Sequence, residues 1–144
     1  MKTFATIASA LLLSLTIGLS GAEAGNKLKL NQFGFGNSFG SLQTGNGNKI
    51  GAAQSGLFND GTVIQHGHNN TGVLGQAGIL NSGAISQTGS GNVGGIGQTG
   101  AFNRGTLTQH GHNNGGLILQ NGVGHSADVS QTGSGNTAVV IQDN

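Results

Sequence analysis

Glutamine has the most unusual distribution of any residue in this 144-residue chain. All of its glutamines are separated by intervals of 11, and none lies elsewhere: Gln32, Gln43, Gln54, Gln65, Gln76, Gln87, Gln98, Gln109, Gln120, Gln131 and Gln142. A side-chain amide offers two N–H donors and an acceptor oxygen, so stacked amides can hydrogen-bond to their own copies. The spacing therefore predicts hydrogen bonds between repeated units and not a catalysed reaction at one site.

The acidic residues offer little for catalysis. After residue 24 they are Asp60, Asp128 and Asp143, which are far apart and outside the glutamine phase. General acid–base catalysis needs groups within hydrogen-bond reach of each other or of the substrate, and no paired carboxylates or nucleophile–base arrangement can be assembled from these residues. We expect no enzyme activity and no cofactor.

Two histidine pairs are the weak candidates for metal binding. His66 and His68 flank one glycine, and His110 and His112 flank another 44 residues later. Imidazoles that converge can bind metal ions. No carboxylate accompanies either pair, so polar turn residues are the better interpretation and no metal site is predicted.

The composition excludes several other functions. Charged residues are 6% of the chain and the net charge is +1, which is too little for a nucleic-acid surface. There is no cysteine, so disulfides, zinc–thiolate sites and thiol nucleophiles are absent. The chain must be stabilised by its pattern of uncharged residues.

The glutamines belong to an 11-residue repeat. Its unit reads Gln-x-Gly-x-x-Asn-x-small-x-apolar-x. Two residues after glutamine lie Gly34, Gly45, Gly56, Gly67, Gly78, Gly89, Gly100, Gly111, Gly122 and Gly133. Five residues after glutamine lie Asn37, Asn48, Asn59, Asn70, Asn81, Asn92, Asn103, Asn114 and Asn136, with His125 in the remaining unit.

Each unit is predicted to be one short strand and one tight turn. The asparagine, the small residue, the apolar residue and the next glutamine alternate, so they share one face of a strand. Glycine and asparagine tolerate positive φ, which indicates a turn around the glycine. The expected strands lie near 37–43, 48–54, 59–65, 70–76, 81–87, 92–98, 103–109, 114–120, 125–131 and 136–142.

A doubled period sets the expected architecture. Turns after Gln43, Gln65, Gln87, Gln109 and Gln131 are polar, whereas those after Gln32, Gln54, Gln76, Gln98 and Gln120 are mostly apolar. A rung of two strands, 22 residues long, places the polar turns on one edge and the apolar turns on the other. Residues 32–144 are therefore predicted to form an all-β, cross-β solenoid of five strand-turn-strand rungs with two facing parallel sheets, about 24 Å tall.

Such a solenoid is expected to polymerise. Inward glutamines and asparagines would form amide ladders from Gln43 to Gln142, and a one-residue slip would turn every glutamine outward. We find no proline and no charged block at either end, although natural proteins usually protect open sheet edges. The end strands should therefore add further copies of the chain. Phe33, Phe35, Phe58 and Phe102 fall in the apolar turns, where they either pack locally or form an adhesive stripe.

The N-terminus resembles a secretory signal peptide. Lys2 precedes an apolar run from Phe4 to Leu19, and Ala22-Glu23-Ala24 has the small-x-small cleavage pattern. We expect residues 1–24 to be removed, and the apolar run is shorter than the ~20 residues of a spanning helix. Residues 25–31 would then be a short N-terminal segment, and no transmembrane segment is predicted.

The repeat resembles that of the curlin family. The closest matches are Gln43-Thr44-Gly45-Asn46-Gly47-Asn48, Gln87-Thr88-Gly89-Ser90-Gly91-Asn92 and Gln131-Thr132-Gly133-Ser134-Gly135-Asn136. The resemblance implies a secreted subunit of curli amyloid fibres, which form biofilm matrix and adhesive fimbriae at the cell surface. It also implies self-association, a nucleating subunit, and an outer-membrane export channel with accessory factors as partners.

The chain departs from the family pattern in two respects. Asparagine stands where the major subunit usually has serine, and the segment before the repeats is short. The regular 11-residue spacing also resembles the minor nucleating subunit, which therefore stays an alternative. A monomeric solenoid adhesin with capped ends is the other alternative, and an ice-binding solenoid is disfavoured because the outward positions do not form a regular threonine array.

Overall fold

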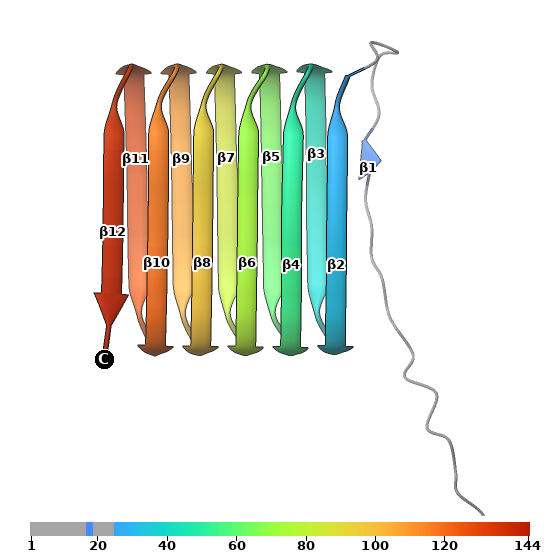
Figure 1. Cartoon of the computed structure of the whole chain (residues 1–144), viewed down its shortest axis with the longest axis vertical. Helices are drawn as coiled ribbons and strands as arrows, with labels where there is room; N and C mark the ends of the chain where they lie inside the picture. The colour runs from blue at the N-terminus through green and yellow to red at the C-terminus, as the bar shows by residue number, and fades with distance from the viewer. Residues whose placement is uncertain (1–16, 19–24) are drawn as a thin grey trace, which may run out of the picture.

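The solenoid is built from two parallel sheets that face each other. The structure, a computed structural model, describes residues 17–18 and 25–144. The predicted signal peptide, residues 1–24, lies outside the described residues except for a two-residue strand, β1 (Ile17–Gly18). Figure 1 shows the two layers, with successive strands passing from one layer to the other and the C-terminus at one end of the stack.

We call the sheets odd and even after their strand labels. The odd sheet has the order β1-β3-β5-β7-β9-β11 and the even sheet the order β2-β4-β6-β8-β10-β12. Besides β1, the odd strands are β3 (Ser38–Asn46), β5 (Asp60–His68), β7 (Ser82–Ser90), β9 (Arg104–His112) and β11 (Ser126–Ser134). The even strands are β2 (Lys27–Phe35), β4 (Lys49–Leu57), β6 (Thr71–Ile79), β8 (Val93–Ala101), β10 (Gly115–Val123) and β12 (Thr137–Asp143).

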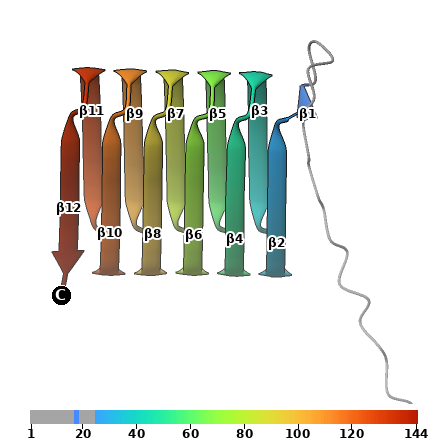
Figure 2. The same cartoon turned by 45° about the horizontal axis from the view of Figure 1, so that its top comes forward.

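The register of the strands follows the glutamines. Within the even sheet Gln76 pairs with Gln98, and within the odd sheet Gln65 pairs with Gln87. From β2 to β12, every strand pairs in parallel with the strand two places along the chain. The prediction of two facing parallel sheets with 22-residue rungs is confirmed. The oblique view in Figure 2 shows the same two layers.

The strands differ from the predicted ones at both ends. Each begins one residue later than expected, and those from β3 to β11 run three residues past the glutamine, so the repeat glycines lie inside strands. Gly45 and Gly133, for example, are the penultimate residues of β3 and β11. The structure also adds β2, which runs from Lys27 and pairs with β4, so most of the expected short segment 25–31 belongs to the solenoid.

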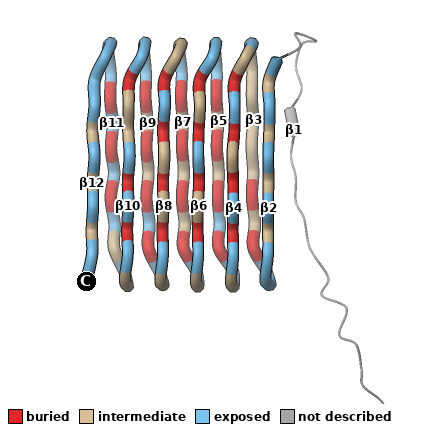
Figure 3. The backbone as a smooth tube through the Cα atoms, viewed as in Figure 1, coloured by how far each residue is buried: buried red, intermediate tan, exposed pale blue. Residues whose placement is uncertain are grey.

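The core lies between the sheets and consists of the apolar side chain of each strand. Val63, Ile85 and Leu107 from the odd sheet meet Leu74, Ile96 and Ile118 from the even sheet, and all are at least 98% buried. Figure 3 shows buried positions alternating with exposed ones along the inner strands, whereas the end strands β2 and β12 have no buried residue. The interior is therefore closely packed, and β2 and β12 are more exposed than the strands between them.

The outer faces of the two sheets differ in chemistry. On the odd sheet the residue before each ladder glutamine changes from Leu42 and Ile64 to Ser86, Thr108 and Ser130. On the even sheet the same position holds Asn31, Ala53, Gly75, Gly97, Leu119 and Ile141. The odd face thus becomes polar toward the C-terminal end, while the even face becomes more apolar.

Candidate self-assembly site

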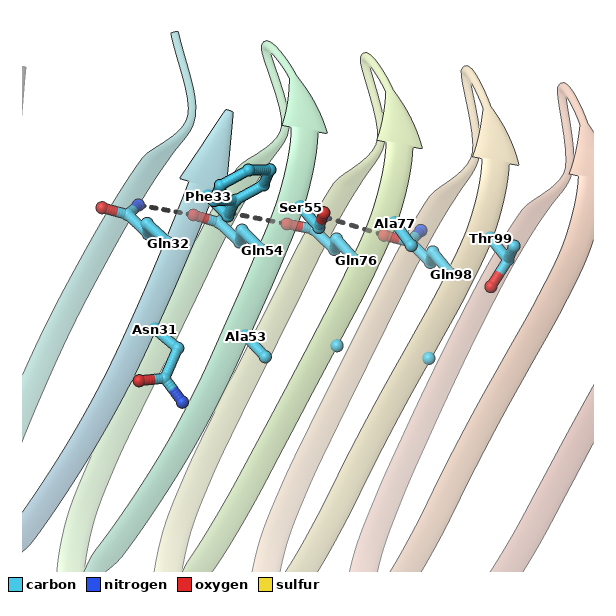
Figure 4. A pocket seen from close by; sticks show the side chains of 12 residues that line it. Asn31, Gln32, Phe33, Ala53, Gln54, Ser55, Gln76, Ala77, Gln98 and Thr99 are labelled. Atoms are coloured by element: carbon cyan, nitrogen blue, oxygen red, sulfur yellow. Dashed lines mark hydrogen bonds between the residues drawn. The ribbon is translucent and has the colours of Figure 1, made fainter. Parts of the chain in front are cut away.

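The glutamines form two continuous hydrogen-bonded ladders, one in each sheet. From Gln32 to Gln120, Nε2 of each glutamine donates to Oε1 of the glutamine 22 residues later, at 2.6–2.9 Å, as Gln65 does to Gln87. Figure 4 shows the row Gln32, Gln54, Gln76 and Gln98 joined in this way. From Gln43 onward Nε2 also donates to a backbone carbonyl of the opposite sheet, for example Gln87 to Thr71 O at 3.0 Å. The ladders therefore join rungs and also join the two sheets.

The asparagines form a second set of ladders at the start of each strand. The backbone N–H of Asn92 donates to Oδ1 of Asn70 at 3.1 Å, and Asn114 and Asn92 repeat this contact. Asparagine Nδ2 also donates to the carbonyl of a repeat glycine, as Asn48 does to Gly67 at 2.9 Å. Asn26 belongs to the same ladder, because Asn48 N donates to its Oδ1. Sequence reasoning missed Asn26, although it lies 11 residues before Asn37.

The repeat glycines are required by the stacking of rungs. Gly67 has φ +117° and Gly78 has φ +126°, a region that L-residues rarely adopt. A Cβ on Gly67 would overlap the carbonyl oxygen of Gly89 in the next rung, and a Cβ on Gly78 would overlap that of Gly100. These glycines aim their carbonyls at the asparagine amides and leave room for the next rung.

The ends of the ladders have unused hydrogen-bonding groups. Among the described residues, Oε1 of Gln32 is buried and has no donor, and it is the one side-chain polar atom of this kind. At the other end, Nε2 of Gln131 and of Gln142 each donates to one carbonyl, Gly115 O and Ser126 O. Each of these amide groups has a second N–H, for which the described part of the chain provides no ladder acceptor. One end thus presents an acceptor and the other presents donors.

The tight turns are two residues beyond the repeat glycines. Their left-handed positions hold Gly47, Asn69, Gly91, Asn113 and Gly135 on the polar edge. On the apolar edge they hold Gly36, Phe58, Leu80, Phe102 and Gly124, with φ of +54° to +58° for the three bulky residues. A bulky side chain in this region carries backbone strain. Half or more of the Phe58 and Phe102 surfaces is exposed, and Phe35 packs edge-on against Phe58 at 5.6 Å.

The histidine pairs lie on the polar edge but do not converge. β7 lies between β5 and β9, so Thr88 separates His66 from His110, and Ser90 separates His68 from His112. Ser90 Oγ is 2.7 Å from His112 Nδ1. Within the described ranges, no group of three or more His, Cys, Asp or Glu side chains could hold a metal ion.

A shallow groove of about 530 Å³ crosses the outer face of the even sheet. Its floor is formed by the small residues Ala53, Gly75 and Gly97, and Asn31 and Phe33 stand at its N-terminal side (Figure 4). No acidic, basic or histidine side chain lines it, so the groove contains no general acid or base. Across the parts of the chain that the structure describes, no helix is long and apolar enough to cross a membrane.

These features define a parallel β-solenoid with internal amide ladders. Residues 111–143 match the sequence model described as the curlin associated repeat. This segment covers the last residues of β9 and the strands β10, β11 and β12, and the register within it is the register of the whole solenoid. This part of the chain is thus similar to the curlin associated repeat. A comparison with curated proteins finds no match to the chain.

Proposed function

We propose that this protein is a secreted structural subunit that assembles into curli-type amyloid fibres for biofilm matrix and cell adhesion. The observation that carries the proposal is the pair of open ladder ends, with a buried acceptor on Gln32 and donors on Gln131 and Gln142. An unpaired buried amide costs a few kcal/mol, and a second copy stacked on the end would satisfy it. The curlin match supports the same function.

The proposed role is mechanical and does not involve catalysis. Backbone edges of the end strands would pair with further copies, and in-register stacking would extend both amide ladders along the fibre. A nucleating subunit and an outer-membrane channel with accessory factors are the proposed partners, on the strength of the curlin match alone. The proposed location is the cell surface, outside the cell.

Secretion is proposed from the N-terminal segment. Cleavage after Ala24 would leave a chain that begins at Gly25, just before β2. Expression of the full sequence with mass measurement of the exported chain tests this step. A mature chain that retains residues 17–18 would contradict it.

Fibre X-ray diffraction tests the assembly itself. The exported chain should form a pelletable fibre with reflections near 4.7 Å and about 10 Å, the spacings between strands and between sheets. A soluble, β-rich monomer that never sediments would refute fibre assembly and would leave a solenoid adhesin as the better function.

A further inference from the structure

From β2 to β12 the described residues form an odd number of strands, and this restricts how copies can stack. From Lys27 onward the even sheet has six strands and the odd sheet has five. Among the described residues, β12 therefore extends the even sheet by one strand beyond the last odd strand, β11. This inference rests on the proposed fibre assembly and concerns the geometry of its junction.

Two junctions are possible for head-to-tail copies with the same axial direction. Without rotation, β2 of the next copy stacks on β12, and β11 faces β3 of the next copy across an empty strand position. With a half-turn about the fibre axis, β2 stacks on β11 and β3 stacks on β12, so both sheets continue. We propose that successive subunits are related by this half-turn.

The amide ladders favour the half-turn. The 11-residue phase places Gln32 of the next copy over Gln131, and Gln43 over Gln142. Gln131 Nε2 then donates to the buried Oε1 of Gln32, the atom that lacks a donor in the single chain. Without rotation Gln142 meets Gln32, while the amides of Gln131 and Gln43 are separated by the empty position.

The charges of the outward side chains at the junction also favour the half-turn. Their positions follow from the register, which aligns Lys29 with Gly51 in β4 and Asp128 with Thr106 in β9. Stacking β2 on β11 therefore places Lys29 beside Asp128, opposite charges on adjacent strands. Without rotation Lys29 lies beside the apolar Val139, which aligns with Leu117.

The neighbouring positions repeat this contrast. After the half-turn Asn31 lies beside Ser130, and Leu42 lies beside Ile141, so polar meets polar and apolar meets apolar. Without rotation, Asn31 lies beside Ile141 and Phe33 lies beside Asp143. The apolar N-terminal end of the odd face, at Leu42, thus matches the C-terminal end of the even face. The polar C-terminal end of the odd face, at Ser130, matches the N-terminal end of the even face.

One described strand occupies the edge that the half-turn junction needs. β1 pairs with β3 through Ile17 and Ser41, on the edge where β12 of the preceding copy would stack. Removal of residues 1–24 would free this edge. The junction should therefore form from the processed chain.

Cysteine cross-linking distinguishes the two junctions, because the natural chain has no cysteine. The variant Asn31→Cys/Ser130→Cys should form intermolecular disulfides in fibres of the exported chain, since paired strands lie about 4.8 Å apart, within disulfide range. The matched variant Asn31→Cys/Ile141→Cys should not. Asn31 lies at the N-terminal end of a subunit, whereas Ser130 and Ile141 lie at its C-terminal end. All three are on the outer faces of the sheets. The readout is a ladder of covalent oligomers on a non-reducing gel after the fibres are dissolved in denaturant.

The outcomes separate this inference from the proposed function. Cross-links in the first variant alone support the half-turn. Fibres with cross-links in the second variant, in both variants or in neither overturn it and leave fibre assembly intact. Failure of the natural chain to form fibres refutes the proposed function itself.

Charge reversal provides an independent test. Lys29→Asp and Asp128→Lys should each slow elongation by about two- to fivefold, because like charges then meet at the junction. The double variant should restore the natural rate. Additive slowing in the double variant would refute contact between these two positions.

The fibre itself should have an axial rise of about 26 Å per subunit with a half-turn, against about 29 Å without rotation.

Discussion

Replacement of one interior ladder glutamine should weaken assembly far more than replacement of its outward neighbour. Gln87 is fully buried and has three side-chain hydrogen bonds. Its Oε1 accepts from Gln65 at 2.7 Å, and its Nε2 donates to Gln109 at 2.9 Å and to Thr71 O at 3.0 Å. Gln87→Ala removes all three bonds and interrupts the odd-sheet ladder at its middle.

The size of the effect follows from the groups that lose their partner. One N–H of Gln65, Oε1 of Gln109 and the carbonyl of Thr71 each lose a hydrogen bond in a dry interior. Each buried group left without a partner costs about 1–3 kcal/mol, so the variant should be less stable by roughly 4 kcal/mol. At about 1.4 kcal/mol per factor of ten, the concentration of unfolded soluble chain in equilibrium with fibres should rise about a thousandfold.

The measurement is the soluble concentration after sedimentation, together with the lag time of assembly. Ser86→Ala is the matched control, because Ser86 faces outward on the same strand and no side-chain hydrogen bond of its own is found among the described contacts. Ser86→Ala should change the stability by no more than about 0.5 kcal/mol. Equal lag times and equal soluble concentrations for the two variants would refute the assignment of the ladder as the assembly element.

Two further predictions concern backbone positions. Gly78→Ala should destabilise the solenoid by about 3 kcal/mol or more, because φ is +126° and the new Cβ overlaps the carbonyl of Gly100. Gly75→Ala, with open space around its Cβ, should change stability by less than about 0.5 kcal/mol, and equal guanidinium midpoints for both would contradict this reading. Leu80→Gly should increase the free energy of unfolding by about 1 kcal/mol, and so raise the guanidinium midpoint, because φ is +55° at this half-exposed residue. Leu80→Ala should give no such increase. A midpoint lowered by the glycine would show that the side-chain contacts of Leu80 outweigh its strain.

The rung length and the inward faces could be predicted from the sequence because glutamine occurs at a single phase. Side chains alternate along a strand, so Asn92, Gly94, Ile96 and Gln98 had to share one face, and the structure buries all four. The same argument applies to β2, where Asn26, Leu28, Leu30 and Gln32 alternate. That strand was missed because the repeat was counted from Gln32 forward.

The strand ends were predicted less well because glycine was treated as a turn residue. Gly89 has φ +117° yet pairs in register with Gly67 and Gly111. The repeat glycine has a positive φ in every rung, so the hydrogen bonds between rungs are kept. Each strand therefore continues through its glycine. The left-handed Phe58 and Phe102 could not be foreseen, since their residue type opposes that conformation and only the stacked neighbours impose it.

The ladder has a direction, and this makes the two ends of the solenoid chemically different. From Gln32 to Gln120 each glutamine donates toward the C-terminal end, whereas from Asn48 onward the backbone N–H of each ladder asparagine donates back to the preceding rung. A copy added at the C-terminal end must therefore bring glutamine acceptors and asparagine N–H donors, and the N-terminal rung offers both. At the C-terminal end one of the two asparagine positions is His125, whose ring lies 3.1 Å from Asn144 Oδ1 and has no amide oxygen to offer. The C-terminal end is therefore the less complete template, and elongation rates at the two fibre ends should differ.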